Sequence, residues 1–254
     1  MKVKRLPLSW YTEKLALNEP FTFARYGDGE WLTILGRIGL KNSNGCTFTQ
    51  ELSDDLVQVL KRQNLYQHAI LTIAKRKQGN EITQYLQDNK INLRWYNGDL
   101  FLDALLNGDL YPFVRELRRR RILYVGNERL RGLNYTGIGM FEYEAYIQPP
   151  PQNAHLYKGQ IVDQVKRLIR QKNIEVVGWS SGLASKVFID EVFMEYPHVT
   201  QIDFGSQWDG FFEPLQHIQD MGRSGSRSYI RKGGHDWDEL LIANRDGIKN
   251  ESQG

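Results

Sequence analysis

The sequence predicts an α/β protein with a Rossmann-like, doubly wound and mostly parallel sheet flanked by helices. Short apolar runs of strand length alternate along the chain with longer segments whose apolar residues recur at helical spacing. This alternation is typical of parallel sheets built from strand–helix–strand units. Because ligands in such sheets bind at the carboxyl ends of the strands, the residues that follow each strand are the first candidates for a site.

The individual elements follow from segment length and apolar spacing. In chain order we expect a buried strand directly before the RYGDGE sequence, a helix at 51–63, strands at 68–74 and 121–127, a helix at 159–173, a strand–turn–helix unit at 174–193 and a strand at 200–206. The Pro-rich sequence at 148–155 interrupts this series. Since the alternation continues beyond it, we interpret it as a rigid loop within one domain and not as a linker.

Composition narrows the class of protein. With 254 residues, of which 41% are hydrophobic and 25% charged, the chain is long enough to bury a sizeable globular core. Its net charge of +3 permits an anionic ligand or a nucleic-acid partner without requiring either. Cys46 is the only cysteine, which excludes an intrachain disulfide and favours a reducing compartment. Without a signal peptide or an apolar run of the ~18 residues that a membrane span needs, a cytoplasmic protein is expected.

The sequence RYGDGE, residues 25–30, is the first candidate site. In a turn, Asp28 and Glu30 on either side of a glycine can face one side and offer oxygen ligands to Mg²⁺ or Mn²⁺. These cations usually bind through one or two carboxylates together with substrate phosphates. Arg25 could then contact a phosphate with two hydrogen bonds. The simpler interpretation is a surface turn with solvated acids, but the aromatic and apolar residues on both sides favour a turn at the edge of the core.

The same block carries a family resemblance. FTFARYGDGEW resembles the signature of the GT-D-type glycosyltransferases, whose Asp-x-Glu element is the counterpart of Asp-x-Asp in other nucleotide-sugar transferases. Later blocks are similar to the family in the expected order: RRRRILYVGNERLRGL, IQPPPQNAHLYKGQIVDQV, IEVVGWSSGLASKVFIDEVF and TQIDFGSQWD. The resemblance covers about residues 20–210 of one domain, 1–254, and leaves a Gly-, Ser- and Arg-rich segment at 221–254 beyond it.

The resemblance implies a Rossmann-like enzyme that moves a sugar from a nucleotide diphosphate, with a UDP-sugar as the expected donor and Mn²⁺ or Mg²⁺ as cofactor. The acceptor hydroxyl would belong to a glycan, a glycoprotein or a hydroxylated base of phage-type modified DNA. Asp28 and Glu30 would be catalytic and would bind the metal. The candidate general bases are Asp203, Asp209, Glu213 and, if Asp28 alone meets the metal, Glu30. Where the family often has a Gly-His pair after Asp203, this chain has Ser206 and no histidine, so Asp209 is a candidate replacement.

Further candidates follow strands or open helices, where backbone N–H groups can bind phosphate. The predicted nucleotide-sugar-binding residues are Arg25, Gly27, Gly126, Asn127, Ser180, Ser181, Gly182 and Gln207. Each glycine-containing turn also has a purely structural explanation. A simple helix cap at Ser181 and a phosphate cradle there are equally good interpretations.

A hydrolase is the alternative function. The sequence GWSSG at 178–182 fits G-x-S-x-G and stands between a predicted strand and helix, as a nucleophile elbow requires. Ser180 would be the nucleophile, and a triad would be completed by Asp203 or Asp209 and then by His217 or His235. The short motif arises often by chance, no HGGG-type oxyanion segment precedes it, and RYGDGE is left unexplained.

Basic clusters leave the acceptor open. Arg118 to Arg121 stand directly before a predicted strand and are interpreted as a solvated helix end, with a polyanionic acceptor as the alternative. A second basic cluster, at 222–237, is interleaved with Tyr229 and Trp237 and suits either a diphosphate lid or contacts to a nucleic-acid backbone. The sequence does not indicate an oligomeric state.

Overall fold

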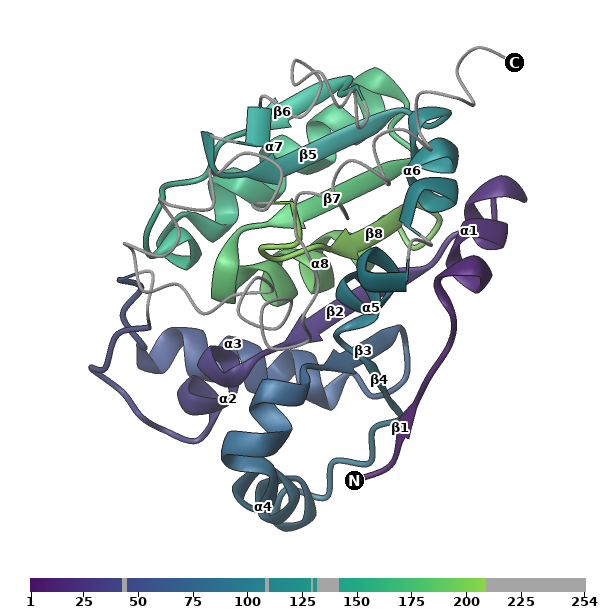
Figure 1. Ribbon diagram of the computed structural model, residues 1–254. Coiled ribbons are helices and arrows are strands. Elements are labelled where there is room, and N and C mark those ends of the chain that lie inside the picture. The colour runs from purple at the N-terminus through teal and green to yellow at the C-terminus, as the bar shows by residue number, and fades with distance from the viewer. Residues whose placement is uncertain (43–44, 108–109, 129, 132–141, 209–254) are drawn as a thin grey trace, which may run out of the picture.

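The computed structural model describes residues 1–42, 45–107, 110–128, 130–131 and 142–208, and within them eight parallel strands form one sheet (Figure 1). The strands are β1 Val3–Lys4, β2 Thr22–Tyr26, β3 Gln67–Ile70, β4 Trp95–Asn97, β5 Ile122–Gly126, β6 Ala145–Ile147, β7 Val176–Ser180 and β8 Thr200–Asp203. Their spatial order is β1-β4-β3-β2-β8-β7-β5-β6. The parallel sheet confirms the predicted α/β class.

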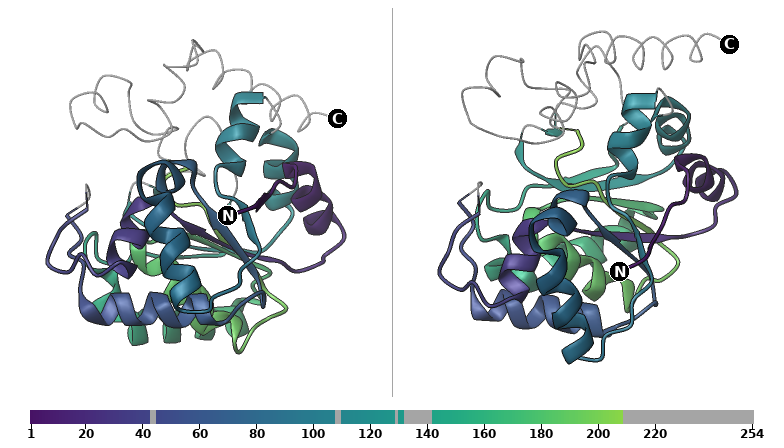
Figure 2. Two further views of the ribbon diagram at one scale, coloured as in Figure 1. Left: turned by 90° about the horizontal axis from the view of Figure 1, so that it is seen from below. Right: turned by 60° about the horizontal axis from the view of Figure 1, so that its bottom comes forward.

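Helices cover both faces of the sheet (Figure 2). They are α1 Leu8–Ala16, α2 Asp28–Ile34, α3 Gln50–Lys61, α4 Thr72–Asp88, α5 Leu100–Asn107, α6 Leu110–Arg118, α7 Lys158–Lys172 and α8 Ser185–Phe193, with short 3-10 turns η2 Ala154–Tyr157 and η3 Gly182–Ala184. Helices α2, α3, α4, α7 and α8 pack on one face, and α1, α5 and α6 pack on the other. In the described part of the chain, no helix is long and apolar enough to cross a bilayer.

The central strands are apolar on both faces because both are covered. Leu123 and Val125 of β5 belong to the core under α7 and α8, whereas their neighbours Ile122 and Tyr124 belong to the core under α1, α5 and α6. This is the two-residue alternation of a strand. A strand buried on both faces reads as a continuous apolar run, which is why the sequence revealed β5 and β7 clearly.

One predicted strand, 68–74, is too long. Strand β3 ends at Ile70 and helix α4 begins at Thr72. The buried residues of α4 are Ala74, Gln78, Ile82 and Leu86, which recur every four positions on the face towards the core. The apolar residues after Ile70 therefore begin a helical stripe, and a short window cannot distinguish that from the end of a strand.

The topology places two segments that are distant in sequence side by side. Strands β2 and β8 are parallel neighbours, with Phe23 opposite Ile202. From β2 the sheet continues to β3 and β4 on one side, while β7 and β5 lie beyond β8 on the other. The carboxyl ends of β2 and β8 thus meet at the position where the strand order reverses. Ligands of doubly wound folds bind at that position.

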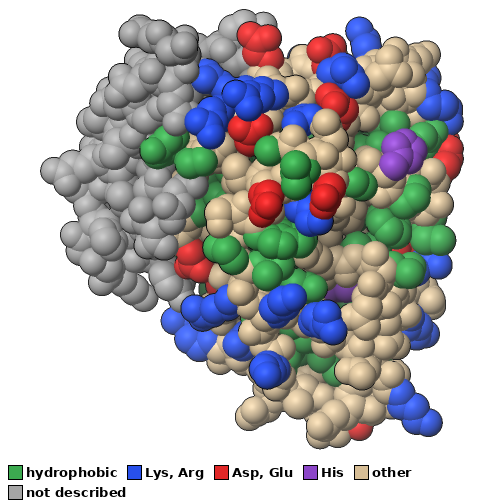
Figure 3. All heavy atoms as spheres, turned by 90° about the vertical axis from the view of Figure 1, so that its right-hand side faces the viewer, with side chains coloured by type: hydrophobic (Ala, Val, Ile, Leu, Met, Phe, Trp, Pro, Cys, Tyr) green, Lys and Arg blue, Asp and Glu red, His purple; other side chains and the backbone are tan. Residues whose placement is uncertain are grey.

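Basic side chains gather on the opposite face of the molecule, at the amino ends of the strands (Figure 3). The arginine run begins at Arg118, the last residue of α6, and ends at Arg121, directly before β5. Arg118, Arg119 and Arg121 are exposed, as expected for a solvated helix end. Basic residues in the last turn also complement the partial negative charge of a helix C-terminus. This run therefore fits the predicted solvated helix end and lies far from the carboxyl ends of β2 and β8, whereas contact with a polyanionic acceptor stays an alternative prediction.

Candidate active site

The RYGDGE sequence spans the end of a strand and the start of a helix. Strand β2 ends at Tyr26, Gly27 caps the next helix, and Asp28 is the first residue of α2. Residues two apart on a helix point in different directions. The expectation that a turn lets Asp28 and Glu30 face the same side is therefore wrong. Their carboxylates have separate partners.

The Asp28 side chain is partly exposed and contacts a lysine of another helix. Its Oδ2 lies 2.5 Å from Nζ of Lys77 in α4. The side chains of Asp28 and Lys77 are 34% and 49% exposed, so this ion pair lies in water. Exposed ion pairs contribute little to stability, and their partners exchange readily. Asp28 is thus the accessible acid of the segment.

Glu30 points back into the protein. Its Oε2 accepts a hydrogen bond from the Gly27 N–H at 2.8 Å, and its Oε1 accepts one from Lys186 Nζ at 2.5 Å. The residue is 6% exposed. A Cβ at position 27 would lie 3.2 Å from Glu30 Oε2 and 3.1 Å from a methyl of Leu71. Glycine at position 27 therefore leaves room for the carboxylate to cap its own helix.

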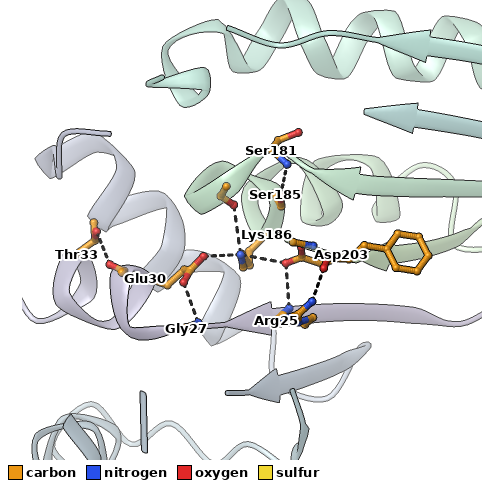
Figure 4. A network of polar contacts seen from close by, with 12 residues as sticks. Arg25, Gly27, Glu30, Thr33, Ser181, Ser185, Lys186 and Asp203 are labelled. Atoms are coloured by element: carbon orange, nitrogen blue, oxygen red, sulfur yellow. Dashed lines mark hydrogen bonds and ion pairs between the residues drawn. The ribbon is translucent and has the colours of Figure 1, made fainter. Parts of the chain in front are cut away.

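Lys186 joins Glu30 to the end of β8 (Figure 4). It lies in the first turn of α8, and its Nζ is 3.0 Å from Asp203 Oδ2 and 3.3 Å from the carbonyl oxygen of Gly182. Asp203 also accepts hydrogen bonds from the backbone N–H groups of Arg25 and Gly205. We call Glu30, Lys186 and Asp203 the buried triad, because none of the three is more than 6% exposed.

The lysine of the buried triad carries its proton. Burial lowers the pKa of Lys186, but the neighbouring carboxylates of Asp203 and Glu30 outweigh burial, so that the pKa is raised above its usual value. Lys186 is therefore an ammonium group between two acids. Charges this deeply buried are tolerated only when they are paired and hydrogen-bonded, and this arrangement meets both conditions.

Arg25 lies at the same edge of the sheet, and its side chain is one reason why residue 205 is a glycine. Its guanidinium donates a hydrogen bond to the backbone oxygen of Phe204. Gly205 has a φ of +55°, and a Cβ there would lie 3.3 Å from the Arg25 guanidinium. The Asp-x-Gly sequence at 203–205 thus needs its glycine both for the left-handed backbone and for the arginine. The structure places Arg25, Gly27, Glu30 and Asp203 together, as predicted from the sequence.

The Ser180–Gly182 segment is joined to this edge through Lys186, which bonds the Gly182 carbonyl. The Ser181 N–H donates to Ser185 Oγ at 3.0 Å, and the Ser181 hydroxyl lies 3.4 Å from the Val125 carbonyl. The Ser181 N–H is thus already used within the turn, and the Ser181 side chain makes no capping hydrogen bond to η3, so the structure favours neither the cap nor the phosphate cradle. A role of Ser180 and Gly182 in nucleotide binding stays a prediction.

The geometry around Ser180 offers the hydrolase hypothesis little. Ser180 is the last residue of β7, and the positive φ of the turn, +62°, falls on Gly182 and not on the serine. The Ser180 hydroxyl lies 2.7 Å from that of Tyr124. In the described part of the chain no histidine pairs with Ser180: the bonded partners of the histidines there are Tyr26 for His68 and Thr49 for His155, and His198 packs on Tyr196. His217, His235, Asp209 and Glu213 lie outside the described residues.

The first glycine of G-x-S-x-G has a packing explanation, which predicts a stability effect. A Cβ on Gly178 would lie 2.7 Å from the ring of Tyr124 and 3.2 Å from that of Phe204. We expect Gly178→Ala to lower the free energy of unfolding by about 1–3 kcal/mol through overpacking. Gly79→Ala, in α4 with open space around it, is the control and is expected to be neutral or stabilising. Urea unfolding measures both, and an unchanged midpoint for Gly178→Ala would contradict the packing explanation.

The remaining candidates are less closely connected to this edge. Gly126 is buried at the end of β5, where a Cβ would lie 2.9 Å from the Tyr124 ring. The backbone oxygen of Asn127 accepts hydrogen bonds from the Leu130 N–H and the Tyr146 hydroxyl. Gln207, just after β8, is 5% exposed. The nucleotide-binding role of these three residues stays a prediction.

Sequence reasoning missed two lysines. Lys186 is the charged residue in the otherwise apolar sequence LASKVFI, and a lysine so placed on a buried helix needs an acidic partner. This sequence pattern could therefore have identified Lys186 as part of a buried ion pair. Lys77 lies among several polar residues of α4, where nothing in the sequence singles it out.

The side chains at this edge offer few ligands for a divalent metal ion. Across the described ranges no group of three His, Cys, Asp or Glu side chains lies close enough to hold one. Asp28 fits the part of a single carboxylate ligand, since it is partly exposed and its ion pair with Lys77 is in water. Glu30 fits it poorly, because its carboxylate is buried and is paired with the Lys186 ammonium, whose positive charge would repel a cation.

Comparisons with known proteins support the fold. No family model matches the chain, and no curated protein matches it. Two solved structures, each 16% identical, match over 87% of this chain and 83% of theirs. One is a selenomethionine-substituted structure of domain of unknown function 1792, with a TM-score of 0.58. The other, with a TM-score of 0.53, is described as showing that this highly conserved domain has a distinct glycosyltransferase fold. The chain therefore has a glycosyltransferase-like fold.

Proposed function

We propose that this protein is a glycosyltransferase that moves a sugar from a nucleotide diphosphate, a UDP-sugar, to an acceptor hydroxyl. One observation carries the proposal. The acidic segment that begins at Asp28 lies where the strand order reverses, at the carboxyl ends of the central strands β2 and β8, in a sheet of glycosyltransferase-like fold. Doubly wound sheets bind their ligands at that position.

The donor diphosphate would be held by Asp28 through Mn²⁺ or Mg²⁺ and by the Arg25 guanidinium. When bound, the cation neutralises charge on the departing diphosphate. Arg25 retains a donor for this task, since its Nε has no hydrogen-bond partner in the described part of the chain. The buried triad keeps helix α2, helix α8 and the end of β8 in fixed positions, so these groups are placed before the donor arrives.

The acceptor and the general base belong to the same proposal. Asp203 and Glu30 both accept a hydrogen bond from Lys186, so neither is free to take a proton from an acceptor in this arrangement. This leaves Asp209 and Glu213 as the candidate bases. The acceptor is a hydroxyl of a glycan, a glycoprotein or a hydroxylated DNA base. DNA binding that weakens steeply with salt would favour the last of these.

Ligand-induced thermal stabilisation tests the donor site. We expect UDP with Mn²⁺ to stabilise the wild type, by about 2.7 kcal/mol at 100 times its Kd, and we expect EDTA to remove most of this effect. Asp28→Asn is expected to abolish the metal-dependent part without lowering the melting temperature of the free protein, because the Asp28–Lys77 pair is exposed.

Asp55→Asn is the matched control. Asp55 also forms a partly exposed pair, 2.8 Å from Lys158, but it lies on α3 and outside the site. Its loss should leave the response to UDP and Mn²⁺ unchanged. If none of UDP, GDP and their sugars raises the melting temperature of the wild type with any metal, the proposed function is wrong.

A further inference from the structure

Each acid of the Asp-x-Glu element is already paired with a lysine, and the two pairs differ in burial. Lys77 lies 2.5 Å from Asp28, and the two side chains are 49% and 34% exposed. Lys186 lies 2.5 Å from Glu30, and these two side chains are 5% and 8% exposed. Lys77 can exchange its contact with Asp28 for contacts with water at little cost in free energy. Lys186 is buried, so the same exchange is not open to it.

Both oxygens of the buried Glu30 carboxylate already accept a hydrogen bond from an internal donor, and one of these donors is an ammonium group. Gly27 N–H occupies Oε2 and Lys186 Nζ occupies Oε1. Because Nζ also lies 3.0 Å from Asp203 Oδ2, the ammonium group stands between the two carboxylates, where a bridging cation would otherwise stand. A second positive charge at that point would be repelled by the first.

Lys186 is held in this place by all three of its N–H donors. Their acceptors are Glu30 Oε1, Asp203 Oδ2 and the Gly182 carbonyl. Withdrawing the side chain would leave two buried carboxylates close together without a counter-ion, which protein interiors do not tolerate. The lysine is a permanent part of the site and does not make way for a metal.

We propose that Asp28 is the only metal ligand of the Asp-x-Glu element, and that Glu30 is a positioning residue which Lys186 locks against Asp203. This inference rests on the proposed function. It assigns Glu30 a role that differs from the one implied by the family resemblance. The internal ammonium of Lys186 provides the fixed charge between α2 and β8, and the exchangeable cation binds at the exposed carboxylate of Asp28.

The test is the ratio of the UDP affinity in Mn²⁺ to that in EDTA, measured by calorimetry for each variant of the full chain. This ratio isolates the metal contribution, since a loss of folded protein lowers both affinities alike. We expect Asp28→Asn to bring the ratio to about one, and Glu30→Gln to keep it within about threefold of the wild type although its melting temperature falls. Asp55→Asn, from the distant pair with Lys158, should match the wild type in both respects.

If Glu30→Gln does not fold, a double variant provides the same test. Glu30→Gln with Lys186→Met removes one negative and one positive charge, so the net charge of the buried triad is unchanged. It is expected to keep the wild-type affinity ratio as well. A ratio near one in either folded variant, with a normal ratio in the wild type, would overturn this proposal alone. A wild type that binds UDP and GDP equally poorly with and without Mn²⁺ would overturn the proposed function and the assignment of Asp28 together.

Discussion

Replacing Lys186 with methionine is expected to lower the free energy of unfolding by about 3–5 kcal/mol, the usual effect of removing one partner from a buried ion pair. The substitution conserves most of the side-chain volume, so the loss reports charge and hydrogen bonding and not a cavity. It leaves Glu30 and Asp203, both less than 7% exposed, without the ammonium that neutralises them. Helix α2 would lose its contact with the consecutive elements α8 and β8, which are distant from it in sequence.

Urea unfolding, followed by far-UV circular dichroism and tryptophan fluorescence, measures this effect. Lys77→Met is the control, since it removes the other lysine of the Asp-x-Glu element from an exposed pair and should change stability by less than about 1 kcal/mol. Addition of Glu30→Gln to Lys186→Met should restore part of the loss, because it removes one of the two uncompensated carboxylates. Equal effects of Lys186→Met and Lys77→Met would show that burial of the triad has no energetic consequence.

The fold could be predicted from the sequence because its strands are buried on both faces. Apolar runs such as those of β5 and β7 are typical of inner strands of a parallel sheet. The same reasoning placed the candidate residues at the carboxyl ends of strands, but it did not give the strand order. The structure shows that β2 and β8 are parallel neighbours, so that the residues after Tyr26 and at Asp203 meet at one edge. Neither inference required knowledge of side-chain contacts.

The arrangement of the acids could not be predicted in the same way. Whether Asp28 begins a helix or sits in a turn depends on Gly27 and on a capping bond from Glu30, and both outcomes suit the local sequence. The ammonium partner of Glu30 is Lys186, which is 156 residues away along the chain. A tertiary contact of this kind leaves no periodic signal in the sequence, so the positioning role that we propose for Glu30 could not be inferred from it.

The length of β3 shows the same limit on a smaller scale. The apolar residues at 68–74 suggested one strand, whereas the chain turns at Leu71 into helix α4. At this turn the backbone of Gly98 lies close to that of Ile70: its N–H donates to the Ile70 carbonyl at 2.9 Å, and a Cβ on Gly98 would lie 2.6 Å from the Ile70 carbonyl carbon. The sequence of β3 alone does not contain such contacts with a neighbouring segment.

His68, in the middle of β3, makes folding stability depend on pH in the mildly acidic range. The residue is 1% exposed, and its ring stacks on Tyr66 with the centroids 4.8 Å apart. Its Nδ1 lies 3.3 Å from the Tyr26 hydroxyl, and its Nε2 has no hydrogen-bond partner in the described part of the chain. Burial without a counter-charge lowers the pKa of His68 from 6.5 to about 4.

The sign of the effect follows from proton binding. In the unfolded chain His68 takes up a proton below about pH 6.5, whereas in the folded protein it stays neutral down to about pH 4. Between these values the unfolded state binds more protons, so stability falls as the pH falls, by about 3 kcal/mol over the whole interval. Above pH 6.5 the group makes no difference.

A His68→Gln variant separates this contribution from that of the carboxylates. The introduced amide keeps a hydrogen-bonding group near Tyr26 but does not titrate, so the stability difference between wild type and variant should shrink steadily from pH 6.5 to pH 4.5. Urea unfolding at half-unit pH steps measures it, with His198→Gln, a substitution of an exposed histidine, as the control variant. A difference that is constant across this range would mean that folded His68 accepts a proton as readily as the unfolded chain does. This result would contradict the conclusion that His68 is neutral in the folded protein, where its ring packs between Tyr26 and Tyr66.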